Sequence, residues 1–140
     1  MISMTSEYAL RALKCLASQA NGNSVLGRDL AREAKVPANY LSKILLSLRR
    51  AGLVSTVRGT GGGYRLQKAP HRIRLSQVVD LFDGVANRQG CVLGRNHRCD
   101  DDHCCSAHHA WRDVRAAYNH FLTDTTLADI SQQPLGPKQH

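Results

Sequence analysis

The sequence predicts a mostly α-helical fold that contains one small β-hairpin. Apolar residues recur at three- and four-residue spacing through much of the first 50 residues and again after residue 107. Between these regions, a run of glycines near residue 61 separates two short segments of β-forming residues. The 140 residues, 42% of them hydrophobic, suffice for one main core and an extension.

Three helical patterns follow one another in the first 50 residues. Thr5 or Ser6 is the expected cap of the first helix, which continues to a turn signal at residues 21–23. The second is expected over about residues 26–34, and the third over about residues 38–50, after Pro37 and before Gly52. Their expected inward-facing residues are Tyr8, Ala9, Ala12, Leu13, Leu16 and Ala17, then Leu30, Ala31 and Ala34, then Leu41, Ile44, Leu45 and Leu48.

The second and third predicted helices are short and are joined by a tight turn, which is the pattern of a helix-turn-helix. Strands expected at residues 53–57 and 64–66 flank the glycine-rich turn 58–63 and would form a wing that approaches a phosphate or a minor groove. A nucleotide-binding phosphate loop is the alternative, but the run lacks the Lys-Ser/Thr pair and the βαβ context. We expect base or groove contacts from Lys43 and Arg58, phosphate contacts from Arg49, Arg50 and Arg65, and a reading face that includes Asn39 and Ser42.

Basic charge is concentrated in the first part of the chain. The net charge is +8, and residues 1–80 contain 13 Lys and Arg against 4 Asp and Glu, whereas residues 81–140 contain 6 against 7. This positive field favours a nucleic acid as the partner. The sequence shows neither an apolar run long enough for a membrane span nor a signal-peptide pattern, so we expect a cytoplasmic protein without membrane contact.

Cys91, Cys99, Cys105 and His108 lie close together in the glycine- and charge-rich stretch 90–109. Five cysteines without a secretory signal favour metal ligands or free thiols over a disulfide framework. The long spacing suits an iron-sulfur cluster better than a tetrahedral zinc site, although three cysteines and a histidine are also a zinc set. The cysteines alone would fit a small redox or electron-carrying iron-sulfur protein, a class that does not explain the wing.

Other chemically reactive side chains are interpreted as structural or solvated. Cys15 stands beside the apolar stripe of the first helix, which is typical of a buried thiol. His109 and His120 lack a close partner in the pattern and are expected at the surface. No Ser/His/Asp or paired-carboxylate arrangement with a supporting fold pattern is found, so no catalysis is assigned.

A long amphipathic helix is expected after residue 107. Its apolar stripe is wider than this small domain needs to cover, which favours a symmetric partner, and folding back onto its own chain is the alternative. The tail after residue 131 carries two prolines and two consecutive glutamines and is expected to be disordered. The proposed dimerisation residues are Trp111, Val114, Tyr118, Phe121 and Leu122.

Several stretches of this chain resemble the winged-helix regulators of the Rrf-two family. They are residues 54–64 (VSTVRGTGGGY), 5–13 (TSEYALRAL), Tyr40-Leu41 with Leu48-Arg49, and residues 126–130 (TLADI). These pieces occur in the family's order with a cysteine cluster between them, and the resemblance covers roughly residues 1–131. In that family, whose branches include the IscR and NsrR types, the fold is a dimer of winged helices and three cysteines hold an iron-sulfur cluster that controls DNA binding.

The resemblance implies a division of the chain. Residues 1–83 would be a winged helix-turn-helix domain, 84–106 a cysteine-bearing cluster loop, 107–131 a long C-terminal dimerisation helix with a short terminal helix, and 132–140 a disordered tail. The run Cys105-Ser106-Ala107-His108 followed by Trp111-Arg112-Asp113 resembles the IscR type and implies Cys105, rather than Cys104, as the third cysteine ligand. The first cysteine gap is longer than in that type.

The resemblance also implies the cofactor and the function. His108 and Glu7 compete as the fourth ligand, because an acidic residue of the partner subunit takes that role in some members. The expected protein is a homodimeric repressor of a pseudo-palindromic operator on double-stranded DNA. Its cluster, preferentially 2Fe-2S rather than 4Fe-4S, would respond to nitric oxide, redox stress or iron status. A zinc-stabilised regulator that binds DNA constitutively is the alternative.

Overall fold

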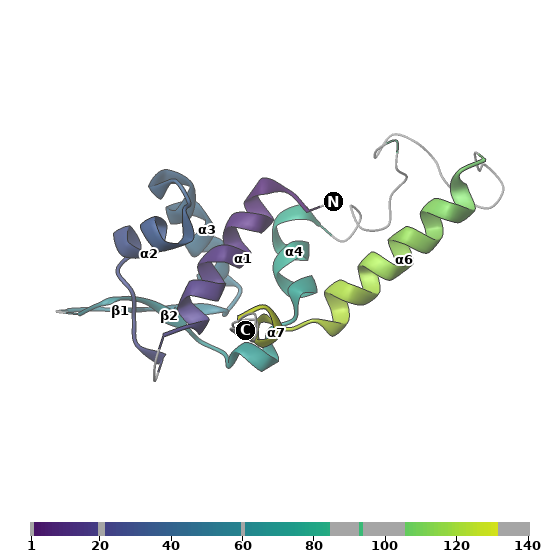
Figure 1. Cartoon of the computed structure of the whole chain (residues 1–140). Coiled ribbons are helices and arrows are strands. Elements are labelled where there is room, and N and C mark those ends of the chain that lie inside the picture. The colour runs from purple at the N-terminus through teal and green to yellow at the C-terminus, as the bar shows by residue number, and fades with distance from the viewer. Residues whose placement is uncertain (1, 20–21, 60, 85–92, 94–105, 132–140) are drawn as a thin grey trace, which may run out of the picture.

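The computed structural model describes residues 2–19, 22–59, 61–84, 93 and 106–131. Its described part is mostly helical with one two-stranded antiparallel hairpin, which confirms the predicted fold class (Figure 1). The elements in order are α1 (Met4–Ala17), α2 (Gly27–Ala34), α3 (Ala38–Arg50), β1 (Val54–Val57), β2 (Gly63–Leu66), the 3-10 turn η2 (Pro70–Arg72), α4 (Leu75–Asp83), α6 (His108–Asp124) and α7 (Leu127–Ser131). None of the described helices is long and apolar enough to cross a membrane.

Helix α1 begins earlier than the sequence pattern suggested. Ser3, rather than Thr5 or Ser6, is its cap, and the Ser3 hydroxyl oxygen accepts a hydrogen bond of 3.1 Å from the backbone N–H of Ser6. The buried carboxylate of Asp83, at the end of α4, accepts hydrogen bonds from both the backbone N–H and the hydroxyl of Ser3. The cap is therefore fixed by a residue 80 positions away, which a local pattern cannot reveal.

The helix-turn-helix consists of α2, a short turn and α3, close to the predicted boundaries. Lys35 ends α2 in the left-handed conformation, with φ 56° and ψ 49°, and its N–H bonds to the last carbonyls of that helix. The predicted apolar stripe of α3 is buried, and together with residues of α1 and α2 it forms the main core. Gly52 follows α3 with φ +77°, which matches its expected place at the helix end.

The hairpin is attached to the helical body by a third segment. Strands β1 and β2 pair from Val54 opposite Leu66 to Val57 opposite Gly63. Val25, in the segment before α2, forms an isolated bridge to Tyr64 through two backbone hydrogen bonds of 2.8 Å each. The wing base is therefore hydrogen-bonded on both sides of β2.

Two elements that the sequence pattern does not predict lie between the wing and the cysteine segment. The 3-10 turn η2 and helix α4 occupy residues 70–83, and α4 packs against both α1 and α6. Leu75 and Val79 of α4 are buried together with Leu122 of α6 in a second, smaller core. Helix α4 thus joins the winged helix to the long C-terminal helix.

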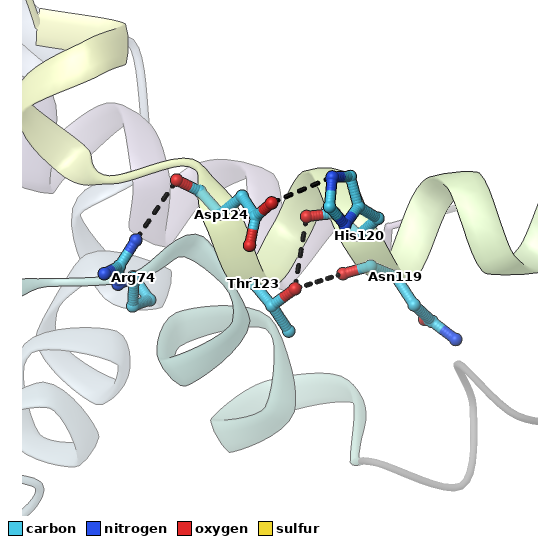
Figure 2. Close-up of polar contacts among 5 residues, drawn as sticks. All are labelled: Arg74, Asn119, His120, Thr123 and Asp124. Carbon is cyan, nitrogen blue, oxygen red and sulfur yellow. Dashed lines mark hydrogen bonds and ion pairs between the residues drawn. The ribbon is translucent and has the colours of Figure 1, made fainter.

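Helix α6 projects away from the body, and α7 turns back beside α1 (Figure 1). The junction is hydrogen-bonded to the chain just before α4: the N–H of Leu75 donates to the Thr125 carbonyl at 3.0 Å, and that of Leu127 to the Ile73 carbonyl at 2.8 Å. The Arg74 guanidinium donates to the Asp124 carbonyl at 3.2 Å (Figure 2). These bonds fix the base of α6 to the winged helix.

Candidate nucleic-acid interface and metal ligands

One face of α3 carries exposed residues, directly opposite its buried stripe. At about 100° per residue, positions 39, 42, 43, 46 and 50 fall on one side of a helix, and positions 41, 44, 45 and 48 on the other. Asn39, Ser42 and Lys43 are exposed, as a reading face requires, and Arg50, a predicted phosphate contact, is exposed at the end of the same side. The Ser42 hydroxyl donates to the Ala38 carbonyl at 3.1 Å, so its oxygen is still available as an acceptor.

Leu46 lies on this same face and is not among the residues predicted to contact DNA. Its side chain is 45% exposed, between Lys43 and Arg50 along the helix. An apolar side chain on a reading face can contact the methyl group of thymine. The helical period alone could have identified it, since Leu46 falls outside the apolar stripe that the other leucines follow.

The wing presents basic side chains next to a turn built mostly of glycine. Arg58 and Arg65 are exposed, and Arg49 is exposed at the end of α3. Across the described part of the turn, the Gly62 N–H donates to the Gly59 carbonyl at 2.9 Å. The exposed cations on the wing and α3 are thus suited to a polyanion such as DNA.

Glu7 belongs to a chain of contacts that ends at α3. Its carboxylate pairs with the Arg11 guanidinium at 2.5 Å, and the Arg11 guanidinium carbon lies 5.7 Å from the centre of the Tyr8 ring. The Tyr8 and Tyr40 rings are 6.3 Å apart, and Tyr40 stands in the first turn of α3. Both partners of the ion pair are more than 40% exposed, so the pair itself adds little stability.

The three predicted cysteine ligands, Cys91, Cys99 and Cys105, lie outside the described residues, as does Cys104. Within the described ranges, no group of three or more Cys, His, Asp or Glu side chains is placed to hold a metal. His108, the first residue of α6, is only 3% exposed, and its ring contacts that of His109 edge-on with centres 5.4 Å apart. The beginning of α6 stands away from α1 in Figure 1.

Cys15 is partly rather than fully buried. It lines a groove of about 400 Å³ between α1 and α2 together with Lys14, Glu33 and Lys35. Burial, reinforced by the negative charge of Glu33, raises the pKa of the Cys15 thiol, and Lys14 opposes this shift weakly. A thiol that stays protonated at neutral pH is a poor nucleophile, in keeping with the structural role expected for it.

The apolar stripe of α6 divides into two parts. Leu122 is 1% exposed and packs with Leu75 and Val79 of its own chain, with Tyr118 against the same cluster. Val114 and Phe121 are 50% and 52% exposed. Folding back on the same chain therefore accounts for the Leu122 side, and an uncovered apolar face remains on the helix.

His120 is exposed, as expected, but it does have a close partner. Its Nε2 lies 2.8 Å from a carboxylate oxygen of Asp124, one turn further along α6 (Figure 2). The Thr123 hydroxyl donates to the carbonyls of Asn119 and His120 in the same turn. The four-residue spacing of His120 and Asp124 could have revealed this pair from the sequence.

The comparisons with known proteins identify the family. The Rrf2 family model, described as an iron-dependent transcriptional regulator, matches residues 2–133. The chain belongs to the Rrf2 family. It is 31% identical to the transcriptional regulator IscR of Vibrio campbellii over 92% of this chain and 76% of that protein, and 32% identical to the regulator NsrR of Bacillus licheniformis over 89% and 87%.

Solved structures of similar fold agree with this membership. The global cysteine regulator CymR of B. subtilis superposes with a TM-score of 0.76 over 94% of this chain and 95% of that chain, at 24% identity. The IscR structure from T. potens gives a TM-score of 0.71 over 97% and 93%, also at 24% identity. The family model and the curated relatives make this chain a DNA-binding transcriptional regulator rather than an enzyme, as predicted. The superposed structures confirm the predicted fold.

Proposed function

We propose that this Rrf2-family regulator binds an operator as a cytoplasmic homodimer and that an iron-sulfur cluster controls this binding. The observation that carries the proposal is the position of His108. An imidazole at the first turn of a projecting helix is ordinarily solvated, yet this one is buried, three residues beyond Cys105 in the sequence. A histidine excluded from water beside a segment with thiolates fits a ligand better than a surface residue.

The proposed ligands are Cys91, Cys99 and Cys105 with His108. Soft thiolates with long spacing and one imidazole suit a cluster of iron, and the relatives named IscR and NsrR support this choice. A bound cluster would supply a centre that oxidants or nitric oxide can alter. Glu7 is the competing fourth ligand, and it would have to come from the partner subunit and leave Arg11.

The role of this chain's own residues is to connect the ligand segment to DNA. Residues 84–106 join α4 to α6, and α4 packs on α1. Binding of a cluster by this segment would therefore be transmitted through α4 to the position of the winged helix. The exposed face of α3 would enter the major groove, and Arg58 of the wing would reach the minor groove or a phosphate. Two such units would contact half-sites about 34 Å apart.

The test of the cluster is the absorption of protein purified without oxygen, together with iron and acid-labile sulfide assays. Cys91→Ala, Cys99→Ala and Cys105→Ala should each abolish the colour, whereas Cys15→Ala should retain it because Cys15 belongs to α1 and not to the proposed ligand segment. Colourless wild-type protein with stoichiometric zinc and no sulfide would instead establish the constitutive zinc-stabilised regulator.

The fourth ligand is tested with matched neighbours. His108→Ala should change the cluster spectrum, and His109→Ala, which removes an exposed imidazole one residue away, should not. For the acidic candidate, Glu7→Gln is the test and Glu33→Gln is the control. Glu7→Gln should change the cluster spectrum only if Glu7 is the fourth ligand. A spectrum altered by Glu7→Gln and unchanged by His108→Ala would assign the site to the partner's carboxylate.

The DNA contacts are tested on operator and random duplexes at several salt concentrations. Arg50→Ala should weaken both duplexes alike and reduce the salt dependence, because a phosphate contact carries no sequence information. Lys43→Ala and Arg58→Ala should cost about 1–3 kcal/mol selectively on the operator. Equal losses on both duplexes would make these residues phosphate contacts.

The homodimer is tested by sedimentation of wild-type protein and of Phe121→Asp. Phe121 belongs to the uncovered part of the α6 stripe, so a buried charge there should dissociate the dimer. Asn119→Asp is the control, placing the same charge on the same helix away from that stripe. A monomeric wild-type protein at micromolar concentration would contradict the proposed assembly.

A further inference from the structure

The wing turn has few side chains with which to pack. Gly59, Gly61 and Gly62 make up most of its described residues, and the φ angles of the first two are +94° and +77°. Strands β1 and β2 have only four residues each, and an isolated hairpin of this size is marginal in water. The position of the turn must therefore be set by contacts with the rest of the protein.

Among the described residues, the two that precede Leu26 supply hydrogen bonds of this kind. The Ser24 hydroxyl donates a hydrogen bond of 2.7 Å to the Gly61 carbonyl, joining residues 37 positions apart. Val25 bonds to Tyr64 on the neighbouring strand. Beyond this attachment, a depression of about 420 Å³ separates the turn from α2, with Asp29 among its lining residues. Within the described part of the chain, the Ser24 hydroxyl thus donates a side-chain hydrogen bond directly to the turn.

The geometry points to Ser24 as a positioning residue for DNA binding. Gly61 lies three residues from Arg58, and the bond from the Gly62 N–H to the Gly59 carbonyl closes the turn between them. A restraint on Gly61 therefore restrains the backbone that carries Arg58. Ser24 would act by keeping Arg58 in place rather than by binding DNA itself, so the inference rests on the wing contact proposed above.

The test compares two substitutions of the same shape. Ser24→Thr keeps the hydroxyl, and Ser24→Val replaces it with a methyl group. We expect Ser24→Val to raise the operator Kd about fivefold, the effect of losing one hydrogen bond, and Ser24→Thr to stay within about twofold. Ser18→Ala is the control, because its hydroxyl also donates to a carbonyl, at 2.9 Å, but at the end of α1 and away from the wing. Ser24→Ala repeats the test without a β-branched side chain.

A double-mutant cycle separates positioning from general stability. In an Arg58→Ala background, Ser24→Val should cause no further loss of operator affinity, since nothing remains for Ser24 to position. An equal fivefold loss in both backgrounds, or wild-type affinity in both Ser24→Val and Ser24→Ala, would overturn the inference. If Arg58→Ala itself leaves the operator affinity unchanged, the proposed wing contact fails, which is a different result.

Discussion

Gly63→Ala should be far more damaging than alanine at the neighbouring glycine Gly61. A Cβ atom built on Gly63 would lie 2.2 Å from the Val25 carbonyl oxygen and 2.8 Å from the Leu26 nitrogen. These are backbone atoms, so no side-chain rotation can relieve the clash. The φ of Gly63 is +141°, a conformation that L-residues rarely adopt. At Gly61, with φ +77°, the new Cβ meets nothing within 4 Å.

The magnitudes follow from these two geometries. Gly61→Ala adds only left-handed strain of about 1 kcal/mol. Gly63→Ala adds backbone strain of about 1–3 kcal/mol and should also break the two hydrogen bonds between Val25 and Tyr64, at about 1 kcal/mol each. We therefore expect the free energy of unfolding to fall by about 3–5 kcal/mol for Gly63→Ala.

Urea unfolding measures both losses, and operator binding measured where the proteins are folded gives the functional effect. Gly63→Ala should release the wing from the segment before α2 and weaken operator binding well beyond the effect of Gly61→Ala. Equal stability losses in the two variants would refute the argument, because they would mean that the attachment of β2 to Val25 is dispensable.

Three further substitutions test other features of the fold. Lys35→Gly should raise the free energy of unfolding by about 1 kcal/mol by relieving the left-handed cap of α2, and destabilisation in urea would show that the Lys35 side chain matters more than its backbone. The alkylation rate of Cys15, followed by peptide mass spectrometry, should rise only at pH values above the ordinary thiol pKa. Glu33→Gln should shift this rise to lower pH, because it removes a negative charge that raises the pKa of the Cys15 thiol. An unchanged pH profile would exclude Glu33 as a cause of the raised pKa. Leu46→Ala should weaken operator binding several-fold and leave the affinity for random DNA unchanged. Replacing thymine by uracil in the operator should weaken its binding to the wild-type protein by the same factor. An unchanged operator affinity of Leu46→Ala would place Leu46 outside the groove.

The sequence predicted those parts of the fold that depend on local periodicity. The stripe of leucines and Ile44 fixed the orientation of α3, and the glycines around residue 61 separated two strands at nearly the observed boundaries. Lys35 was not recognised as a left-handed cap because lysine gives no such signal. The cap of α1 was misplaced for a different reason, since Asp83 determines it through a contact between distant residues.

The candidate site was predictable to the extent that helix faces determine it. Exposure of Asn39 and Lys43 follows from the same period that buries the opposite stripe. The attachment of the wing through Ser24 was not foreseen, because a serine in a loop has many possible hydrogen-bond partners. Leu122 belongs to the stripe predicted to form a dimer surface, but it is buried against α4, a helix that the sequence pattern does not predict.

Helix α7 determines when the core can be completed as the chain is synthesised on the ribosome. Leu127 is fully buried in the same core as α1, α2 and α3, and it lies 44 residues beyond Asp83, the last residue of α4. At about 5–20 residues per second, a ribosome needs roughly 2 to 9 s to synthesise that intervening chain. During this interval the nascent winged helix lacks one of its core side chains and exposes the surface that will receive it. Completion of the DNA-binding core therefore has to wait until the whole cysteine segment has been synthesised.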